Sequence, residues 1–202
     1  MKSYYEITKE LAKKDEILEK AINTVKQEIK PDPDIDIYYS LLSSIVSQQL
    51  SVKVAKVIWR RLTELFADQY PEAKQVLITP DDDFRAIGLS RQKTKYINNV
   101  AQFSLDNDIS FDYLNKMKDD EIVEYLTQIV GIGKWTVQMI LMFPMDRPNV
   151  FPVDDLGIQT KMKAWYGVDL EKKELRSKLT QISEKWSPYK TLACKYIWES
   201  EL

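Results

Sequence analysis

The apolar residues of the chain recur at three- and four-residue steps, the spacing that places side chains on one face of an α-helix. One series begins near the N-terminus and predicts a helix that ends at Pro31 and Pro33. Its members are Ile7, Leu11, Leu18, Ala21, Ile22, Val25 and Ile29. The same period continues over residues 38–49 and 52–66. Because no segment shows the strict alternation of a half-buried strand, the pattern predicts an all-α protein.

The segment 121–143, EIVEYLTQIVGIGKWTVQMILMF, predicts two helices joined by a short turn. Two of the chain's five glycines, Gly131 and Gly133, stand in this turn. Small residues there leave the backbone N–H groups at the start of the second helix unshielded, and the helix dipole makes that end positive. A phosphate group can dock at such a turn. Taken alone, the same pattern also fits a plain helix–helix connection without a ligand.

The composition removes several kinds of chemistry. The 202 residues include no histidine and only one cysteine, Cys194. The chain therefore cannot form an internal disulfide or a cysteine–histidine metal site, and it offers no serine–histidine or cysteine–histidine pair for catalysis. Proton transfer must involve carboxylates, tyrosines, lysines or water. With a formal net charge of −2, any basic surface for an anionic partner must be local.

No segment predicts a membrane anchor or a secretory leader. The longest apolar run, residues 139–143, is far too short to cross a bilayer. The N-terminal MKSYYEITKELAKK lacks the apolar block of a secretory signal. We therefore expect a cytoplasmic, intracellular protein.

Five segments in order carry a resemblance to a known family. They are SIVSQQLS at 44–51, GLSRQKTKYI at 88–97, VGIGKWT at 130–136, FPMDRPNVFPVDD at 143–155 and WSPYKTLACKYIW at 186–198. Together they resemble the helix-hairpin-helix DNA glycosylase superfamily, which is named for this hairpin and for a Gly/Pro-rich loop with an aspartate, here Asp155. Within it the chain is most similar to the 3-methyladenine DNA glycosylase II branch of bacteria and yeasts, without the extra N-terminal β-rich domain that bacterial members often carry.

The resemblance implies a two-lobed, all-α helix-hairpin-helix fold with the active site in the cleft between the lobes. We expect residues 37–149 to form the middle lobe that carries the hairpin. Residues 1–36 and 150–202 should form the second lobe, which brings the catalytic aspartate to the cleft.

Asp155 occupies the family's catalytic position. Breaking an N-glycosidic bond develops positive charge on the sugar, and a carboxylate near the anomeric carbon stabilises that charge and can orient the attacking water. Its neighbour Asp154 is interpreted as a cap or supporting group. Without the resemblance, both aspartates would be read as caps of a helix that begins near Leu156.

Residue 135 bears on the kind of reaction. In the family's bifunctional members, which form a Schiff base and nick the strand, a lysine stands two residues beyond the second hairpin glycine. Here that position is Trp135, and Lys134 comes one place early. The resemblance therefore implies a monofunctional enzyme in which water attacks and an abasic site remains in an intact strand. We expect no cofactor in catalysis, since a single cysteine cannot ligate the iron–sulfur cluster of the endonuclease III branch.

The resemblance also implies residues that recognise the base. Trp135 and Trp198 match aromatic positions of the base pocket, and an indole face attracts an alkylated purine cation by about 0.5 to 2 kcal/mol. Met139, one turn beyond Trp135, replaces an aromatic residue of some bacterial relatives and suggests a wider pocket. Without the resemblance, both tryptophans would be interpreted as core residues.

Contacts to DNA are expected at two places. In the turn SQQLS, a wedge that fills the gap left by the flipped base would come from Gln49, Leu50 or Ser51, and the sequence does not choose among them. At the hairpin we expect contacts from Gly131, Gly133, Lys134 and Thr136. A basic stripe is either a further DNA contact or a solvated helix face: it comprises Lys53, Lys56 and Arg60, with Arg91, Lys93 and Lys95. By resemblance, a structural Na⁺ or K⁺ would bind the backbone carbonyls of Thr127, Ile129 and Ile132.

The expected activity is that of a DNA-3-methyladenine glycosylase in base excision repair, which hydrolyses alkylated purines such as 3-methyladenine and 7-methylguanine from duplex DNA. We expect a monomer that acts at the nucleoid in a bacterium or in the nucleus of a eukaryote. Two alternatives stay open. One is a non-catalytic module that binds damaged or branched DNA through the hairpin, and the other is a glycosylase for deaminated, etheno or oxidised bases.

Overall fold

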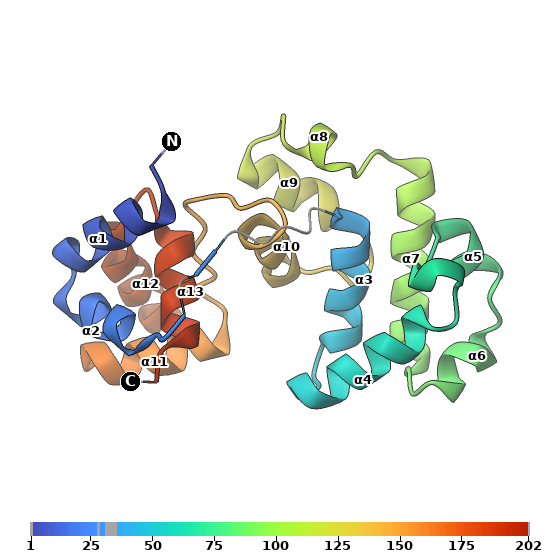
Figure 1. Ribbon diagram of the computed structural model, residues 1–202, viewed down its shortest axis with the longest axis horizontal. Coiled ribbons are helices and arrows are strands. Elements are labelled where there is room, and N and C mark those ends of the chain that lie inside the picture. Colours follow the sequence, from blue (N-terminus) through green and yellow to red (C-terminus); the bar gives the residue numbers. More distant parts are fainter. Residues whose placement is uncertain (1, 28, 31–35, 202) are drawn as a thin grey trace. The chain divides into compact units, whose positions relative to one another are not determined.

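The computed structural model describes residues 2–27, 29–30 and 36–201. Over these residues the regular elements are thirteen α-helices and two short 3₁₀ helices, so the predicted all-α class is confirmed (Figure 1). None of the described helices combines the length and the hydrophobicity needed to cross a bilayer. The chain divides into two compact units, residues 1–33 with 141–202, and residues 34–140. The two units are described separately below.

The unit of residues 34–140 is organised around α7 (Arg91–Asp106), its longest helix. This helix packs against α3, α5 and α6, and α3 also packs against α4. Fully buried side chains such as Leu42, Phe84 and Ile97 form the core between them. The other elements are α3 (Ile37–Ser47), α4 (Val52–Thr63), η1 (Ala67–Gln69), α5 (Ala73–Ile78), α6 (Asp81–Ala86), α8 (Phe111–Leu114), α9 (Asp119–Leu126) and α10 (Lys134–Met142).

The second unit is built around α13 (Lys190–Glu199), whose residues 190–197 are all buried. This helix contacts α1, α2 and α11, so it forms the centre of the unit (Figure 1). The other elements are α1 (Tyr4–Lys14), α2 (Glu16–Thr24), α11 (Leu156–Tyr166), α12 (Lys172–Ser183) and η2 (Glu184–Trp186).

The single N-terminal helix expected from the apolar period is wrong. The structure has two helices that meet at Asp15, whose backbone is extended and whose Oδ1 accepts from the N–H groups of Ile17 and Leu18. Asp15 is only 5 % exposed, and its Oδ2 also accepts from Tyr166 Oη at 2.9 Å and Trp186 Nε1 at 3.1 Å. A buried cap with four donors therefore breaks the helix although the apolar period continues.

The second of these helices also ends earlier than expected. It stops at Thr24, and the two apolar residues that close the series, Val25 and Ile29, lie beyond it in non-helical backbone. The expected helix end at Pro31 and Pro33 falls outside the described residues.

Candidate functional site

The glycine hairpin joins α9 to α10 and needs glycine at one position for steric reasons. Gly131 has a φ of +112°, a conformation that residues with a Cβ rarely adopt. A Cβ there would also lie 2.3 Å from Cγ of Tyr96. At Gly133, by contrast, a Cβ would meet nothing within 4 Å, so the space beside the backbone is open.

The start of α10 lies directly after this open position. The N–H of Val137 donates to the carbonyl of Gly133 at 3.1 Å, so Gly133 supplies the first hydrogen-bond acceptor of the helix. Gly133 and Lys134 are exposed. The side chain of Thr136 is buried, with 3 % exposed, so only its backbone N–H can supply the DNA contact expected at that residue. The N–H groups of a helix's first turn have no intrahelical acceptor and suit an anion.

The turn SQQLS connects α3 to α4 and contains one residue in left-handed conformation. Gln49 has a φ of +58° and is exposed, and Leu50 is partly exposed. Ser51 caps α4, because its Oγ accepts from the N–H of Val54 at 3.4 Å. The three wedge candidates therefore differ in the structure, and Ser51 already has a structural role.

Trp135 and the turn SQQLS, residues 47–51, which we call the wedge turn, line one pocket of about 520 Å³ within the unit of residues 34–140. The lining residues are Ser43, Ser44, Ser47, Gln48, Gln49, Leu50 and Trp135. Trp135 is 39 % exposed, so its indole is not a core residue. Met139, one turn further along α10, is partly buried. The structure thus brings the expected base-pocket tryptophan next to two of the expected wedge residues.

Asp155 lies at the start of α11, in the other unit, and acts as its N-cap. Its Oδ1 accepts from the N–H of Ile158 and from Nε1 of Trp198, both at 2.9 Å. The indole of Trp198 in turn stacks on Phe143, with ring centroids 5.8 Å apart and an interplanar angle of 22°. These contacts hold the carboxylate in one orientation.

The structure distinguishes the two neighbouring aspartates. Asp154 is exposed and pairs with Arg176 of α12 at 2.5 Å. The N-cap of α11 is Asp155, so of the two roles expected for Asp154, cap or supporting group, the cap does not apply. Pairing with a cation 22 residues away could not be inferred from the local pattern around the aspartates.

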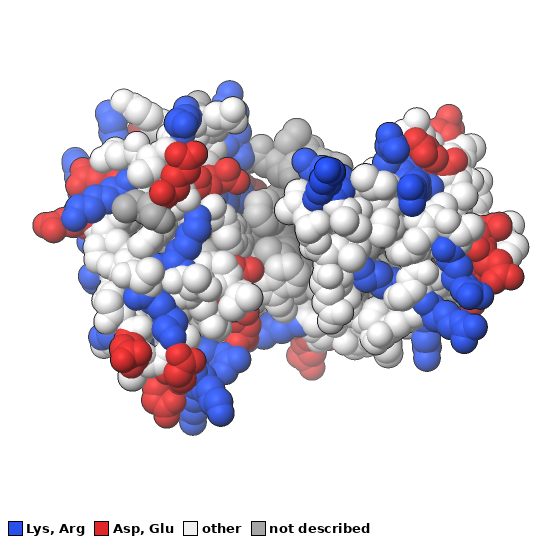
Figure 2. All heavy atoms as spheres, turned by 90° about the horizontal axis from the view of Figure 1, so that it is seen from below, with Lys and Arg blue, Asp and Glu red and all other residues white. Residues whose placement is uncertain are grey.

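The basic stripe expected from the sequence is not uniform. Lys53, Lys56 and Arg60 are exposed on α4. Lys93 instead turns inward, where its Nζ donates to the carbonyls of Val46 and Gln48, and burial lowers the pKa of its ammonium. Figure 2 shows basic and acidic side chains interspersed on one face of the molecule, so positive charge is local rather than continuous.

Several residues make contacts with the site that had not been expected from the sequence. Lys93, Tyr96 and Asn99 of α7, together with Gln48, contact the hairpin or the wedge turn. Lys93, Tyr96 and Asn99 are spaced three residues apart in the sequence, and this signal could have identified a shared face of the helix. Phe143, which supports Trp198, gave no such signal because it lies in a loop segment.

Among the described residues, no group of three or more aspartate, glutamate or cysteine side chains lies close enough to bind a metal ion. The carbonyls expected to bind a monovalent cation belong to the hairpin backbone, where Ile129 accepts from the N–H of Ile132 at 2.9 Å.

The chain is similar to known proteins over most of its length. Residues 42–188 match the family model described as HhH-GPD superfamily base excision DNA repair protein. The chain is 31 % identical to YfjP of Bacillus subtilis, covering 83 % of this chain and 60 % of YfjP. It is also 31 % identical to DNA-3-methyladenine glycosylase 1 of Schizosaccharomyces pombe, covering 81 % of this chain and 72 % of that protein. The chain thus spans about three fifths of the length of YfjP and most of the yeast enzyme.

A solved structure shares the fold over nearly its whole length. It is the S. pombe 3-methyladenine DNA glycosylase Mag1 in complex with abasic DNA, with a TM-score of 0.86 and 26 % identity. The match covers 96 % of this chain and 95 % of that one.

Proposed function

The chain belongs to the HhH-GPD superfamily of base excision DNA repair proteins, and from this premise we propose that it is a monofunctional DNA N-glycosylase that releases alkylated purines from duplex DNA. The observation that carries the proposal is the carboxylate of Asp155, oriented by Trp198 Nε1 and the N–H of Ile158 at the start of α11. The S. pombe relative and the solved structure described above are both named 3-methyladenine DNA glycosylases, which supports this substrate class.

In the proposed reaction, the damaged nucleotide leaves the base stack before cleavage, because Asp155 cannot reach its sugar inside the duplex. The bond between the sugar C1′ and the purine nitrogen breaks, and the electron pair leaves with the base. Asp155 stabilises the positive charge that develops on the sugar. Water then forms the new C1′–O bond and gives its proton to the carboxylate or to solvent. The products are a free base and an abasic site in an intact strand.

Trp135 supports this choice of reaction and of substrate. An indole cannot form a Schiff base, so the residue at the lyase position of bifunctional relatives favours water as the nucleophile. Its partly exposed face is suited to a base that carries positive charge after alkylation at N3 or N7, through a cation–π attraction that neutral bases lack. Met139 and Trp198 complete the proposed base contacts, with 3-methyladenine and 7-methylguanine as the preferred bases.

The DNA contacts of the proposal lie in the hairpin and the wedge turn. Gly133, Lys134 and the first N–H groups of α10 would hold a backbone phosphate, and Gln49 or Leu50 would fill the gap left by the flipped base. We expect the protein to act as a monomer, in the compartment that holds the DNA.

A monovalent cation at the carbonyls of Thr127, Ile129 and Ile132 is a separate part of the proposal. A carbonyl oxygen has two lone pairs, so Ile129 can accept the N–H of Ile132 and still contact a cation. If K⁺ or Na⁺ binds there, replacing it by tetramethylammonium at equal ionic strength should weaken DNA binding.

The test is to incubate the protein with methylated genomic DNA and to identify the released bases by mass spectrometry. The wild type should release 3-methyladenine and 7-methylguanine, and alkali should be needed to cut the strand afterwards. Asp155→Asn should lower release by about 100-fold or more while DNA binding persists. Asp154→Asn is the matched control, because it changes the same chemical group one residue away.

Three results would change the conclusion. Near-normal release by Asp155→Asn would remove the catalytic assignment. Binding without release by the wild type would favour a non-catalytic DNA-binding module. Release of deaminated, etheno or oxidised bases in place of methylpurines would keep the enzyme class and correct the substrate.

A further inference from the structure

One face of α7 contacts both segments expected to touch DNA. Lys93, Tyr96 and Asn99 follow one another at three-residue steps, which places them on the same side of the helix. We call these three residues the α7 brace. Lys93 and Asn99 donate hydrogen bonds to backbone carbonyls beside the wedge turn and in the hairpin. The ring of Tyr96 fills the space beside Gly131, where a side chain would otherwise lie.

Lys93 fixes the end of α3, where the wedge turn begins. Its Nζ donates to the carbonyl of Val46 at 2.8 Å and to that of Gln48 at 2.7 Å. The C-terminal end of a helix carries partial negative charge, so an ammonium group there is favourably placed. The next residue, Gln49, has the left-handed backbone that reverses the chain. Lys93 therefore holds the residues from which the wedge projects, and its ammonium group is directed at these carbonyls.

Tyr96 and Asn99 fix the hairpin. The ring of Tyr96 occupies the place where a Cβ of Gly131 would otherwise lie, and Nδ2 of Asn99 donates to the carbonyl of Val130 at 2.9 Å. A direct link closes the arrangement, because Nε2 of Gln48 donates to the carbonyl of Gly131 at 3.2 Å. The wedge turn and the hairpin are thus connected both to the same helix face and to each other.

We propose that the α7 brace positions the wedge turn relative to the phosphate-binding hairpin, so that grip on the backbone and insertion into the base stack occur in one fixed geometry. This inference rests on the proposed function. It makes Lys93 and Asn99 positioning residues for base extrusion. They need not contact DNA, and they take no part in bond cleavage.

The test uses Lys93→Met, which keeps an unbranched side chain only one atom shorter and removes its N–H donors. Lys74→Met, an exposed lysine on α5 of the same unit, is the control for loss of one positive charge. Extrusion is read from the fluorescence of 2-aminopurine placed beside a 2′-fluoro-stabilised 7-methylguanine in a duplex. This probe is not cleaved, so the signal reports base extrusion whether or not the protein releases bases, and a failure of the proposed activity would appear separately in the base-release assay.

Lys93→Met should reduce the extruded fraction by about tenfold on a fully paired duplex, where flipping has its full energetic cost. The defect should shrink to less than about threefold when the damaged nucleotide is mispaired, because such a base flips more easily. Lys93→Arg, which can still donate to both carbonyls, should recover at least half of the wild-type extrusion. Lys74→Met should match the wild type in both duplexes.

A second variant covers the case in which Lys93→Met does not fold. Asn99→Ala removes the contact to the hairpin from a partly exposed position and should give the same dependence on base pairing. If both single variants fold, the double variant should lose less extrusion than the product of the two defects, because they disturb one arrangement. Wild-type extrusion in Lys93→Met or Asn99→Ala, or equal defects on paired and mispaired duplexes, would overturn the proposal.

Discussion

The indole Nε1 of Trp198 donates a hydrogen bond to Oδ1 of Asp155 at 2.9 Å. The sequence had predicted Trp198 as a wall of the base pocket, whereas the structure shows that it orients the proposed catalytic carboxylate. The same oxygen accepts from the N–H of Ile158, so one backbone donor and one side-chain donor together set its direction. The position of Trp198 is itself supported by its stacking on Phe143.

Trp198→Phe tests this role directly. Phenylalanine keeps an aromatic ring against Phe143 but removes the donor, and a hydrogen bond to a charged group contributes about 1.5 kcal/mol or more. We expect the single-turnover rate of base release to fall by about tenfold, while the affinity for abasic DNA stays within about twofold. A normal rate in a folded variant would show that the N–H of Ile158 suffices to orient Asp155.

Gly157→Ala separates stability from activity at the same carboxylate. Gly157 is in the first turn of α11, where alanine should favour the helix by about 0.5 to 1 kcal/mol. Its Cβ, however, would lie 3.2 Å from Oδ1 of Asp155 and 3.5 Å from Cδ1 of Trp198. We therefore expect an unchanged or higher free energy of unfolding in urea together with a lower rate of base release. Parallel loss of both would point to a general disturbance of the helix.

The sequence predicted the helical class because the period of apolar positions holds in amphipathic helices such as α1 and α4. It failed at Asp15, since the period does not reveal a residue whose carboxylate accepts from Tyr166 and Trp186 across the unit. The spacing of apolar residues shows which face of a helix is apolar. It does not show which distant side chains will donate hydrogen bonds to a buried capping carboxylate.

For the candidate site as well, the sequence predicted some features and missed others. The hairpin glycines and Asp155 could be proposed from the sequence because they lie in local motifs, and the structure adds a steric reason for Gly131. The role of Lys93 was missed because a lysine within a basic stripe looks solvated in sequence, whereas its long side chain reaches two carbonyls more than forty residues away. The three wedge candidates could not be ranked, since the left-handed backbone of Gln49 and the capping role of Ser51 are visible only in the folded turn.

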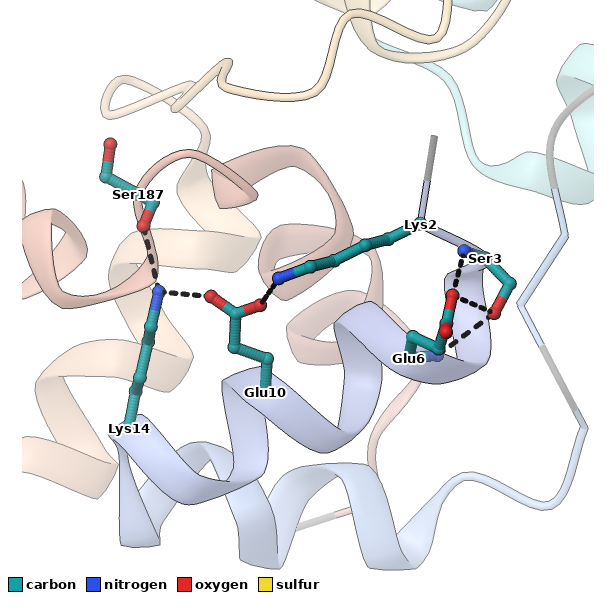
Figure 3. A network of polar contacts seen from close by, with 6 residues as sticks. All are labelled: Lys2, Ser3, Glu6, Glu10, Lys14 and Ser187. Carbon is teal, nitrogen blue, oxygen red and sulfur yellow. Dashed lines mark hydrogen bonds and ion pairs between the residues drawn. The ribbon is translucent and has the colours of Figure 1, made fainter.

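The ion pairs of Glu10 should make the stability of the fold depend on pH. It accepts from Nζ of Lys14 at 2.8 Å and from Nζ of Lys2 at 2.5 Å, and Lys14 also donates to the carbonyl of Ser187 at 3.1 Å (Figure 3). The hydrogen bonds from Lys14 and Lys2 lower the pKa of Glu10 from 4.5 to about 2. Because the folded pKa lies below the ordinary value, the stabilisation is fully present above pH 4.5 and is lost as the pH falls towards 2.

Urea unfolding at a series of pH values measures this effect. Glu10→Gln should make the free energy of unfolding depend less on pH between 4.5 and 2 than in the wild type. The difference should shrink in high salt, since these side chains are at least partly exposed to solvent and their charges are screened. Glu124→Gln, an exposed carboxylate on α9, is the control and should leave the slope unchanged. Identical slopes for wild type and Glu10→Gln would mean that the ion pairs do not contribute to stability in solution.

The two hairpin glycines form a matched pair, because alanine should affect them in different ways. At Gly131 the φ of +112° and the 2.3 Å approach to Tyr96 predict that alanine destabilises the fold by about 2 to 5 kcal/mol, from backbone strain together with overpacking.

At Gly133 nothing lies within 4 Å of the added Cβ, so the free energy of unfolding should stay within about 0.5 kcal/mol. The new methyl group would instead keep a phosphate away from the first turn of α10, and affinity for duplex DNA should fall by about tenfold whatever its sequence. Thermal unfolding and duplex-binding titrations on both variants check the pair. Normal DNA affinity in a stable Gly133→Ala variant would show that the phosphate is held elsewhere.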